Sequence, residues 1–198
     1  MSEESYKRKL TAIFSTDVKD YSRLMGEDEL ATVATLKKYR QVIAEYINRY
    51  QGRVIDSPGD NLLAEFASVV NAVECALAVQ EEIKSQNKEV PKKRRMEFRI
   101  GVNLGDVIQD KDRIYGDGVN IAARLEGLAN AGEVWISSMA YDQVKSKIPV
   151  GFEYQGRQKV KNIPDPIRVY RLLTDSLNPD PLFIGGKRTT RNIGNGWL

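Results

Sequence analysis

Apolar positions divide the first half of the chain into short strands and long helices. The apolar run at residues 10–14 stops at three polar residues, Ser15 to Asp17, which predicts a buried strand with a carboxylate near its end. From Glu27 to Tyr50, apolar residues recur at helical spacing, which predicts one long amphipathic helix. The predicted apolar face of this helix holds Leu30, Val33, Leu36, Ile43 and Ile47.

A hairpin and a second helix are predicted next. Residues 53–56 and 61–66 read as two strands, and Ser57-Pro58-Gly59-Asp60 between them is a turn sequence. The tip of this hairpin is therefore acidic. Ser68 can cap a helix that continues to Asn87, and the polar residues that follow predict a surface loop.

The second half of the chain opens with a long strand. Residues 96–108 alternate between apolar and polar positions, with Phe98, Ile100, Val102 and Leu104 on one face. The remaining predicted elements are, in order, a helix at 119–128 opened by Gly116-Asp117-Gly118, a strand at 134–136, a short helix that ends at Val144, and a closing hairpin of strands 152–160 and 167–172.

This order of elements predicts an α+β fold. Strands and helices follow one another as β-α-ββ-α-β-α-β-α-ββ, so we expect helices packed on one mostly antiparallel sheet. We expect a single domain over residues 1–175. From residue 176 to 198 the chain is rich in Pro, Gly, Asn and basic residues without an apolar pattern, which predicts a flexible basic tail or linker.

Composition narrows the classes of function. Lys and Arg total 30 against 27 Asp and Glu, and both signs are spread along the chain, which argues against nucleic-acid binding. No window approaches the roughly 18 apolar residues of a membrane span, so we expect no membrane insertion. The single cysteine, Cys75, favours a core position and a cytoplasmic location. The absence of histidine excludes Ser-His and Cys-His catalysis, and it leaves groups suited to Mg²⁺ and phosphate.

Two carboxylates and one helix carry the candidate chemistry. Asp17 and Asp60 each lie beside an apolar strand, and at adjacent strand ends they can hold two Mg²⁺ ions about 4 Å apart. On spacing alone, turn formation is the alternative explanation for each aspartate. Asn120 and Arg124 share one face of the predicted helix, where an amide can orient a ribose and a guanidinium can stabilise a phosphoryl charge. A solvated helix face is the alternative for that pair.

In combination and order, these segments resemble the catalytic domain of class III adenylate and guanylate cyclases. The resemblance extends from about Leu10 to Arg171. It is carried by residues 17–24, 53–66, 98–107, 115–126 and 160–170. It implies a ferredoxin-like core, a nucleoside triphosphate substrate and a head-to-tail homodimer with composite sites at its interface. It also implies two Mg²⁺ or Mn²⁺ ions in each active site.

The resemblance assigns the metal and phosphate positions on one subunit. Asp17 and Asp60 match the family's metal-binding aspartates, and the backbone carbonyl of Val18 matches a further ligand. Backbone groups from Val18 to Ser22, with Tyr21 among them, would cradle the triphosphate.

Further positions match residues that contact the ribose and the phosphates. Asn120 matches the asparagine that positions the ribose, and Arg124 matches the arginine that stabilises the transition state. Both would come from the subunit opposite the metals. Arg99 and Lys161 match basic residues that bind the phosphates.

The chain departs from the adenylate cyclase pattern at the base-reading positions. Asp56 and Arg113 stand where adenine-specific relatives carry a lysine and an aspartate. This pair fits guanine, since an Asp accepts from a ring N–H and an Arg donates to a carbonyl oxygen, and it also fits uracil. Alternatively, Asp56 and Arg113 form a salt bridge and leave a permissive site that uses ATP. A further departure is Asp20, where many relatives have glycine, because its carboxylate must point away from the triphosphate or weaken binding.

The sequence therefore predicts a nucleotide cyclase that converts ATP or GTP into a 3′,5′-cyclic nucleotide and pyrophosphate for second-messenger signalling. Three alternatives stay open. They are a pyrimidine cyclase of an anti-phage system, a catalytically silent nucleotide-binding dimerisation module, and a nucleotidyl transferase, which the Asn120 and Arg124 helix disfavours.

Overall fold

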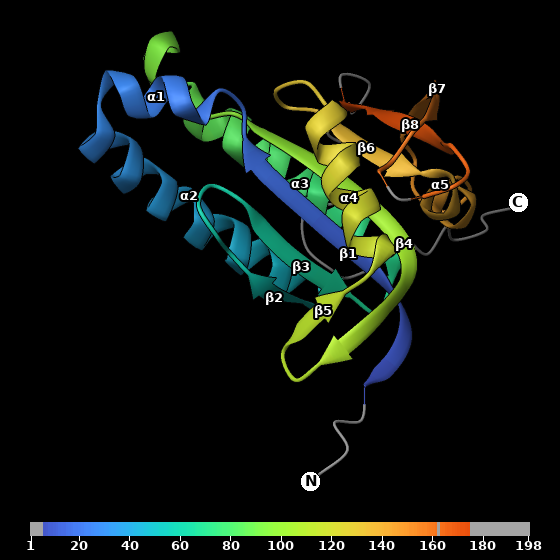
Figure 1. Ribbon diagram of the computed structural model, residues 1–198. Coiled ribbons are helices and arrows are strands. Elements are labelled where there is room, and N and C mark those ends of the chain that lie inside the picture. Colours follow the sequence, from blue (N-terminus) through green and yellow to red (C-terminus); the bar gives the residue numbers. More distant parts are fainter. Residues whose placement is uncertain (1–5, 162, 175–198) are drawn as a thin grey trace, which may run out of the picture.

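One mixed β-sheet organises residues 6–161 and 163–174, which the computed structural model describes (Figure 1). Within these residues the sheet has eight strands in the order β2-β3-β1-β4-β6-β8-β7, and β5 pairs with β4. The strands are β1 (Lys7–Val18), β2 (Gly52–Asp56), β3 (Leu62–Phe66), β4 (Phe98–Asp110), β5 (Arg113–Tyr115), β6 (Val134–Ser137), β7 (Gly151–Gln158) and β8 (Ile167–Leu173). Among the described strands, β4 and β6 are the one pair that runs parallel. The predicted α+β class with a mostly antiparallel sheet is confirmed.

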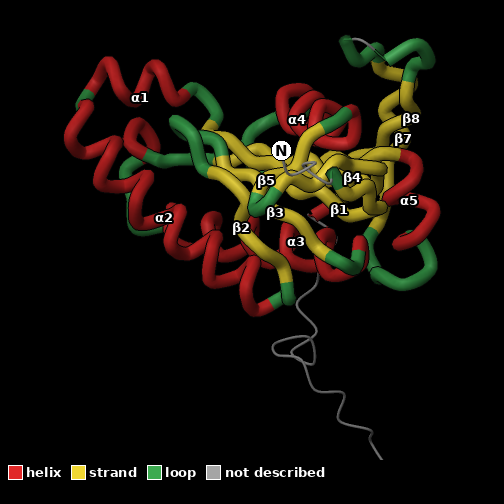
Figure 2. Tube along the Cα trace, turned by 60° about the horizontal axis from the view of Figure 1, so that its bottom comes forward, coloured by secondary structure: helices red, strands yellow, loops and turns green. Residues whose placement is uncertain are grey.

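Helices cover the two faces of the sheet unequally (Figure 2). The helices are α1 (Tyr21–Glu27), α2 (Glu29–Arg49), α3 (Val69–Asn87), the 3-10 turn η1 (Lys92–Arg94), α4 (Asp117–Leu128) and α5 (Ser138–Val144). Helices α2, α3 and α5 enclose the main core on one face, whereas α4 packs on the other face over two smaller apolar clusters. Among the described residues no further helix covers α4, so side chains on its outward side are exposed.

The main core follows the buried side of α2 and α3. The buried residues of α2 are Thr32, Leu36, Tyr39, Ile43 and Ile47, which recur at helical spacing. The prediction that Leu30 belongs to this face is wrong, because Leu30 is 85% exposed. At 3.6 residues per turn it points about 120° away from Leu36. Cys75 is fully buried, and burial raises the pKa of its thiol to about 12, so its predicted core role is confirmed.

The backbone of helix α4 packs directly against the backbone of β4. A Cβ added to Gly101 of β4 would stand 2.2 Å from the carbonyl oxygen of Ala122 and 2.5 Å from the backbone nitrogen of Glu126. Asn103 of the same strand is buried and donates to the carbonyl of Gly118 at 2.9 Å. The absence of a side chain at Gly101 and the anchor at Asn103 together set the position of α4.

Three local features differ from the prediction. Helix α1 lies before the predicted helix and has a single buried residue, Leu24, so it leaves no periodic signal. Strand β5 is too short for an alternation pattern. Strand β1 continues past the predicted end, because Ser15 and Thr16 donate hydrogen bonds to Glu126 and to the carbonyl of Arg99.

The predicted tail at residues 176–198 lies outside the described residues. Within the described ranges, no helix has the length and apolar character that crossing a membrane requires.

Candidate active site

The two aspartates that are predicted to bind metal lie near each other, where β1 ends and β3 begins. Asp17 precedes the last residue of β1, and Asp60 lies in the turn that leads into β3. Because β1 and β3 pair antiparallel, with Thr16 opposite Leu62, the end of one strand lies beside the start of the other. The backbone N–H of Val18 donates to Asp60 Oδ2 at 3.2 Å. This hydrogen bond ties the β2–β3 turn to the end of β1.

Arg99 compensates the charge of Asp17. It lies opposite Asp17 in the pairing of β1 with β4, and its guanidinium donates twice to that carboxylate, from Nε to Oδ1 at 2.8 Å and from Nη2 to Oδ2. A further hydrogen bond joins Arg99 Nη1 to the carbonyl of Gly127 at 3.2 Å. The hydrogen bond to Asp17 raises the pKa of Arg99, so the guanidinium stays cationic. Arg99 thus lies beside Asp17 and also lines the pocket described below.

An open pocket of about 610 Å³ adjoins these residues, a volume within the range of small-molecule sites. It is lined by residues of β1, the first turn of α1, the β2–β3 turn and β4: Val18, Asp20, Tyr21, Ser22, Arg23, Asp60 and Arg99. We call Asp17, Val18, Asp60 and Arg99, together with this pocket, the carboxylate half. A second hollow of about 460 Å³, between α1, α2 and η1, contains none of the predicted site residues.

Arg40 of α2 supports the turn that carries Asp60, and the sequence analysis missed it. Its Nη2 donates to the backbone carbonyls of Ser57 and Asn61, both at 3.0 Å, and also to that of Gly59. These contacts bracket Asp60 on both sides. No local pattern distinguishes an arginine of this kind from a solvated one, because its partners lie in a different element.

Glu126 is a buried carboxyl group that the sequence analysis also missed. It is 5% exposed, lies on the sheet side of α4 and accepts a hydrogen bond from Ser15 Oγ. Burial raises the pKa of Glu126 to about 7, and the charge of Asp17 nearby adds to this effect. A sequence signal existed, because Glu126 follows the inward-facing Leu125 and points about 160° away from the exposed Arg124.

Asn120 and Arg124 lie on the outward side of α4, as their spacing predicted. Both side chains are exposed, whereas Ala122 and Leu125 on the inward side are fully buried. Among the described residues the side chains of Asn120 and Arg124 have no hydrogen-bond or ion-pair partner. Neither lines the pocket of the carboxylate half in the same chain.

Asp56 and Arg113 lie on two elements that approach each other without forming a salt bridge. Asp56 ends β2 and accepts a hydrogen bond from the backbone N–H of Ser57 at 2.8 Å, while Arg113 begins β5 and is exposed. The alternative that Asp56 and Arg113 form a salt bridge is therefore not seen within the single chain. We call Asp56, Arg113, Asn120 and Arg124 the α4 half. Lys161 is exposed in the connection between β7 and β8, at the opposite end of the sheet from β2.

The donors of the carboxylate half suit Mg²⁺ or Mn²⁺. In the ranges that the structure describes, no group of three or more His, Cys, Asp or Glu side chains could hold a metal by itself. Mg²⁺ typically takes one or two carboxylates and completes its shell with water and substrate phosphates. Asp17, Asp60 and the Val18 carbonyl match this pattern. The cationic Arg99 on Asp17 shows that this carboxylate binds positive charge.

The fold is α+β with a mostly antiparallel sheet, and it places two aspartates where β1 ends and β3 begins, apart from the exposed asparagine and arginine of α4. This combination points to a class III nucleotide cyclase. Comparison with known proteins supports this class. The chain belongs to the family described as "Adenylate and Guanylate cyclase catalytic domain", whose model matches residues 3–174. Members of this family are nucleotide-binding lyases.

Individual relatives agree with the family. "Putative adenylate cyclase 3" of Rhizobium meliloti (strain 1021) is 41% identical over 171 residues, which are 86% of this chain and 29% of that protein. A solved adenylate/guanylate cyclase/hydrolase from Silicibacter pomeroyi has a TM-score of 0.81 and 35% identity, covering 85% of this chain and 99% of its own. The adenylyl cyclase CyaB from P. aeruginosa, at a TM-score of 0.74 and 24% identity over 85% of this chain and 96% of its own, shows the same fold. This chain thus spans less than a third of the length of the Rhizobium relative.

Proposed function

We propose that this chain converts ATP or GTP into a 3′,5′-cyclic nucleotide and pyrophosphate, as a homodimer with two divalent cations in each active site. The observation that carries the proposal is the separation of the two halves. Asp17 and Asp60 lie together beside a pocket that contains no residue of α4, while Asn120 and Arg124 are exposed without partners in the described residues. A second copy of the chain supplies what each half lacks.

In the proposed reaction, the ribose 3′-oxygen attacks the α-phosphorus in line and loses its proton. The bond from the α-phosphorus to the oxygen that bridges to the β-phosphorus breaks, and pyrophosphate leaves with that oxygen. When bound at Asp17, Asp60 and the Val18 carbonyl, the cations supply the charge that lowers the pKa of the 3′-hydroxyl and neutralises the phosphates.

Side chains of both copies bind and orient the substrate. Backbone groups at residues 18–22 cradle the triphosphate, and Arg99 with Lys161 adds positive charge around it. From the second copy, Asn120 orients the ribose. Arg124 stabilises the negative charge that develops on the α-phosphoryl oxygens in the transition state.

Asp56 and Arg113 recognise the base in this proposal. Guanine offers its N1–H and N2 amine to Asp56 and its O6 to Arg113. The absence of a salt bridge between these two side chains leaves both free for such contacts. The name of the Rhizobium relative instead favours ATP, so both purines enter the proposal and the experiment decides between them.

A four-nucleotide screen tests the proposal. The homodimer is incubated with ATP, GTP, UTP or CTP and Mg²⁺ or Mn²⁺, and cyclic products are separated by chromatography. We expect a cyclic purine nucleotide that Arg124→Ala abolishes and that the matched control Arg49→Ala, on α2, leaves intact. Product from UTP or CTP alone would reassign the chain to the pyrimidine cyclases. Thermal stabilisation by nucleotides without any product would identify a silent binding module.

A further inference from the structure

Base recognition by Asp56 and Arg113 requires that β2 and β5 keep a fixed separation. The sheet itself does not join these strands, since β2 pairs with β3, β5 pairs with β4, and β3 and β1 lie between them in the sheet. The hairpin of β4 and β5 curls over the sheet and returns toward β2 (Figure 1). Side chains must therefore bridge this gap.

Apolar contacts bridge it in part. Ile55, next to Asp56, and Ile114, next to Arg113, belong to one hydrophobic cluster on this face of the sheet. Ile114 is 4% exposed. Such burial is non-directional, so it draws the strands together without setting the orientation of the polar side chains.

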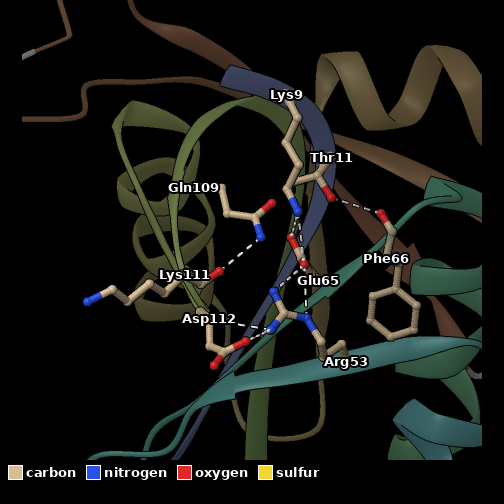
Figure 3. A network of polar contacts seen from close by, with 8 residues as sticks. All are labelled: Lys9, Thr11, Arg53, Glu65, Phe66, Gln109, Lys111 and Asp112. Atoms are coloured by element: carbon tan, nitrogen blue, oxygen red, sulfur yellow. Dashed lines mark hydrogen bonds and ion pairs between the residues drawn. The ribbon is translucent and has the colours of Figure 1, made fainter. Parts of the chain in front are cut away.

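A polar network crosses the same gap (Figure 3). Arg53 of β2 lies opposite Glu65 of β3 and donates to Glu65 Oε1 from Nε at 3.1 Å and from Nη2 at 2.7 Å. Lys9 of β1 donates to the same oxygen at 3.0 Å. Arg53 Nη1 reaches the β4–β5 turn, where it lies 3.3 Å from Asp112 Oδ1 and 3.4 Å from the Asp112 carbonyl oxygen. Asp112 directly precedes Arg113, so the link ends beside one of the two base readers.

The two ends of this network differ in exposure to solvent. Glu65 is 8% exposed, whereas the side chain of Asp112 is 96% exposed. Burial by itself would raise the pKa of Glu65, but the hydrogen bonds from Lys9 and Arg53 outweigh it and lower the pKa. Glu65 is therefore charged and buried, and its two hydrogen bonds from Arg53 orient the Arg53 side chain. In this orientation Arg53 contacts Asp112 in the exposed turn.

We propose that Arg53 is a positioning residue for base selection: held by Glu65, it binds Asp112 and thereby sets the separation of Asp56 and Arg113. This inference rests on the proposed function, since the two base readers act only on a bound nucleotide. Arg53 and Asp112 then govern which nucleotide is used more than the rate of the chemical step.

The test compares kcat and KM for all four nucleotides in the homodimer of the wild type, Asp112→Asn, Asp112→Glu and Lys111→Ala. Asp112→Asn should lower the preference for the best nucleotide over the next by about two- to fivefold, the range of an exposed ion pair, and chiefly through KM. Asp112→Glu keeps the carboxylate and should therefore keep the nucleotide preference of the wild type. Lys111→Ala is the matched control, because its side chain leaves the same turn away from the network (Figure 3).

Arg53→Gln should lower the preference at least as far, and adding Asp112→Asn to it should cause no further loss, since both changes remove one link. An unchanged preference in Asp112→Asn, or an equal loss of kcat on every nucleotide together with a lower Tm, would overturn the positioning role. If the wild type forms no cyclic product at all, the proposed function fails and this inference fails with it. If the wild type is active and Asp112→Asn has the same nucleotide preference as the wild type, this inference fails and the proposed function stands.

Discussion

The carboxylate half and the α4 half differ in how completely one chain satisfies their polar groups. Asp17 is 8% exposed and paired with Arg99, and Asp60 accepts from the backbone of Val18. In the α4 half, the side chains of Asn120 and Arg124 are exposed and have no hydrogen-bond or ion-pair partner among the described residues. The polar groups of the carboxylate half are thus paired within the chain, whereas the side chains of Asn120 and Arg124 in the α4 half are left exposed.

The support beneath the two halves differs as well. The carboxylates sit on a strand end and a turn, which Arg40 holds through backbone carbonyls. Asn120 and Arg124 sit on a helix that is pressed against β4 at Gly101. Arg40 and Gly101 both act on backbone, so the turn and the helix are held in place without contacts to the side chains of Asn120 and Arg124.

The largest expected effect is the loss of kcat when a substitution disables the carboxylate half or the α4 half. Asp17→Ala and Arg124→Ala should each lower the kcat of the homodimer by about a thousandfold, because each removes charge stabilisation in the reaction. Mixing the two variants should restore about a quarter of wild-type activity, since half of randomly formed dimers are mixed and each mixed dimer has one intact site.

The control for this mixture is Asp17→Ala with Asp60→Ala. Both lesions lie in the carboxylate half, so no arrangement of subunits assembles an intact site and no activity should return. Recovery in the control, or none in the test mixture, would contradict the division into two halves.

A second prediction concerns the support of α4. Gly101→Ala should lower the free energy of unfolding by about 3 kcal/mol, because the new methyl group meets helix backbone that can move only if α4 leaves the sheet. Gly127→Ala on α4 is the control, since nothing lies within 4 Å of its added Cβ and alanine favours the helix. Urea unfolding of both variants measures the difference. A Gly101→Ala protein as stable as the wild type would show that α4 is not held by this contact.

The parts of the site that depend on local pattern could be predicted from the sequence. The spacing of Asn120 and Arg124 predicts that they share one helix face, and the apolar runs beside Asp17 and Asp60 predict that both lie at strand ends. The structure has these positions as expected. Periodicity and strand ends are properties of neighbouring residues, which is why a single sequence reveals them.

The supporting contacts could not be predicted, because their partners are distant in the chain. Ser15 bonds Glu126 across 111 positions, and Arg40 holds a turn 17 to 21 residues away. Neither residue type signals such a partner. The exposure of Leu30 has a related cause, since tertiary packing, and not hydrophobicity alone, decides which side of α2 is buried.

A third prediction tests the support of the carboxylates. Arg40→Ala should weaken the apparent affinity for Mg²⁺ by about tenfold, because residues that orient a metal ligand contribute at this level. The Mg²⁺ dependence of activity at saturating nucleotide measures the change. Lys37→Ala, on the same helix and exposed, is the control. Equal Mg²⁺ dependence in Arg40→Ala and Lys37→Ala would remove Arg40 from the site's support.

The smallest effect is expected at Asp20, an exposed pocket residue with φ 57° and ψ 34°. Glycine and asparagine both tolerate this left-handed conformation, so Asp20→Gly and Asp20→Asn remove a negative charge from the pocket without backbone strain. Each should lower KM for the nucleoside triphosphate by about twofold, the scale of one exposed charge, with kcat unchanged. A decrease in Asp20→Gly alone would assign the effect to the backbone. A decrease in both would show that the carboxylate half, although organised within one chain, carries a charge that opposes its anionic substrate.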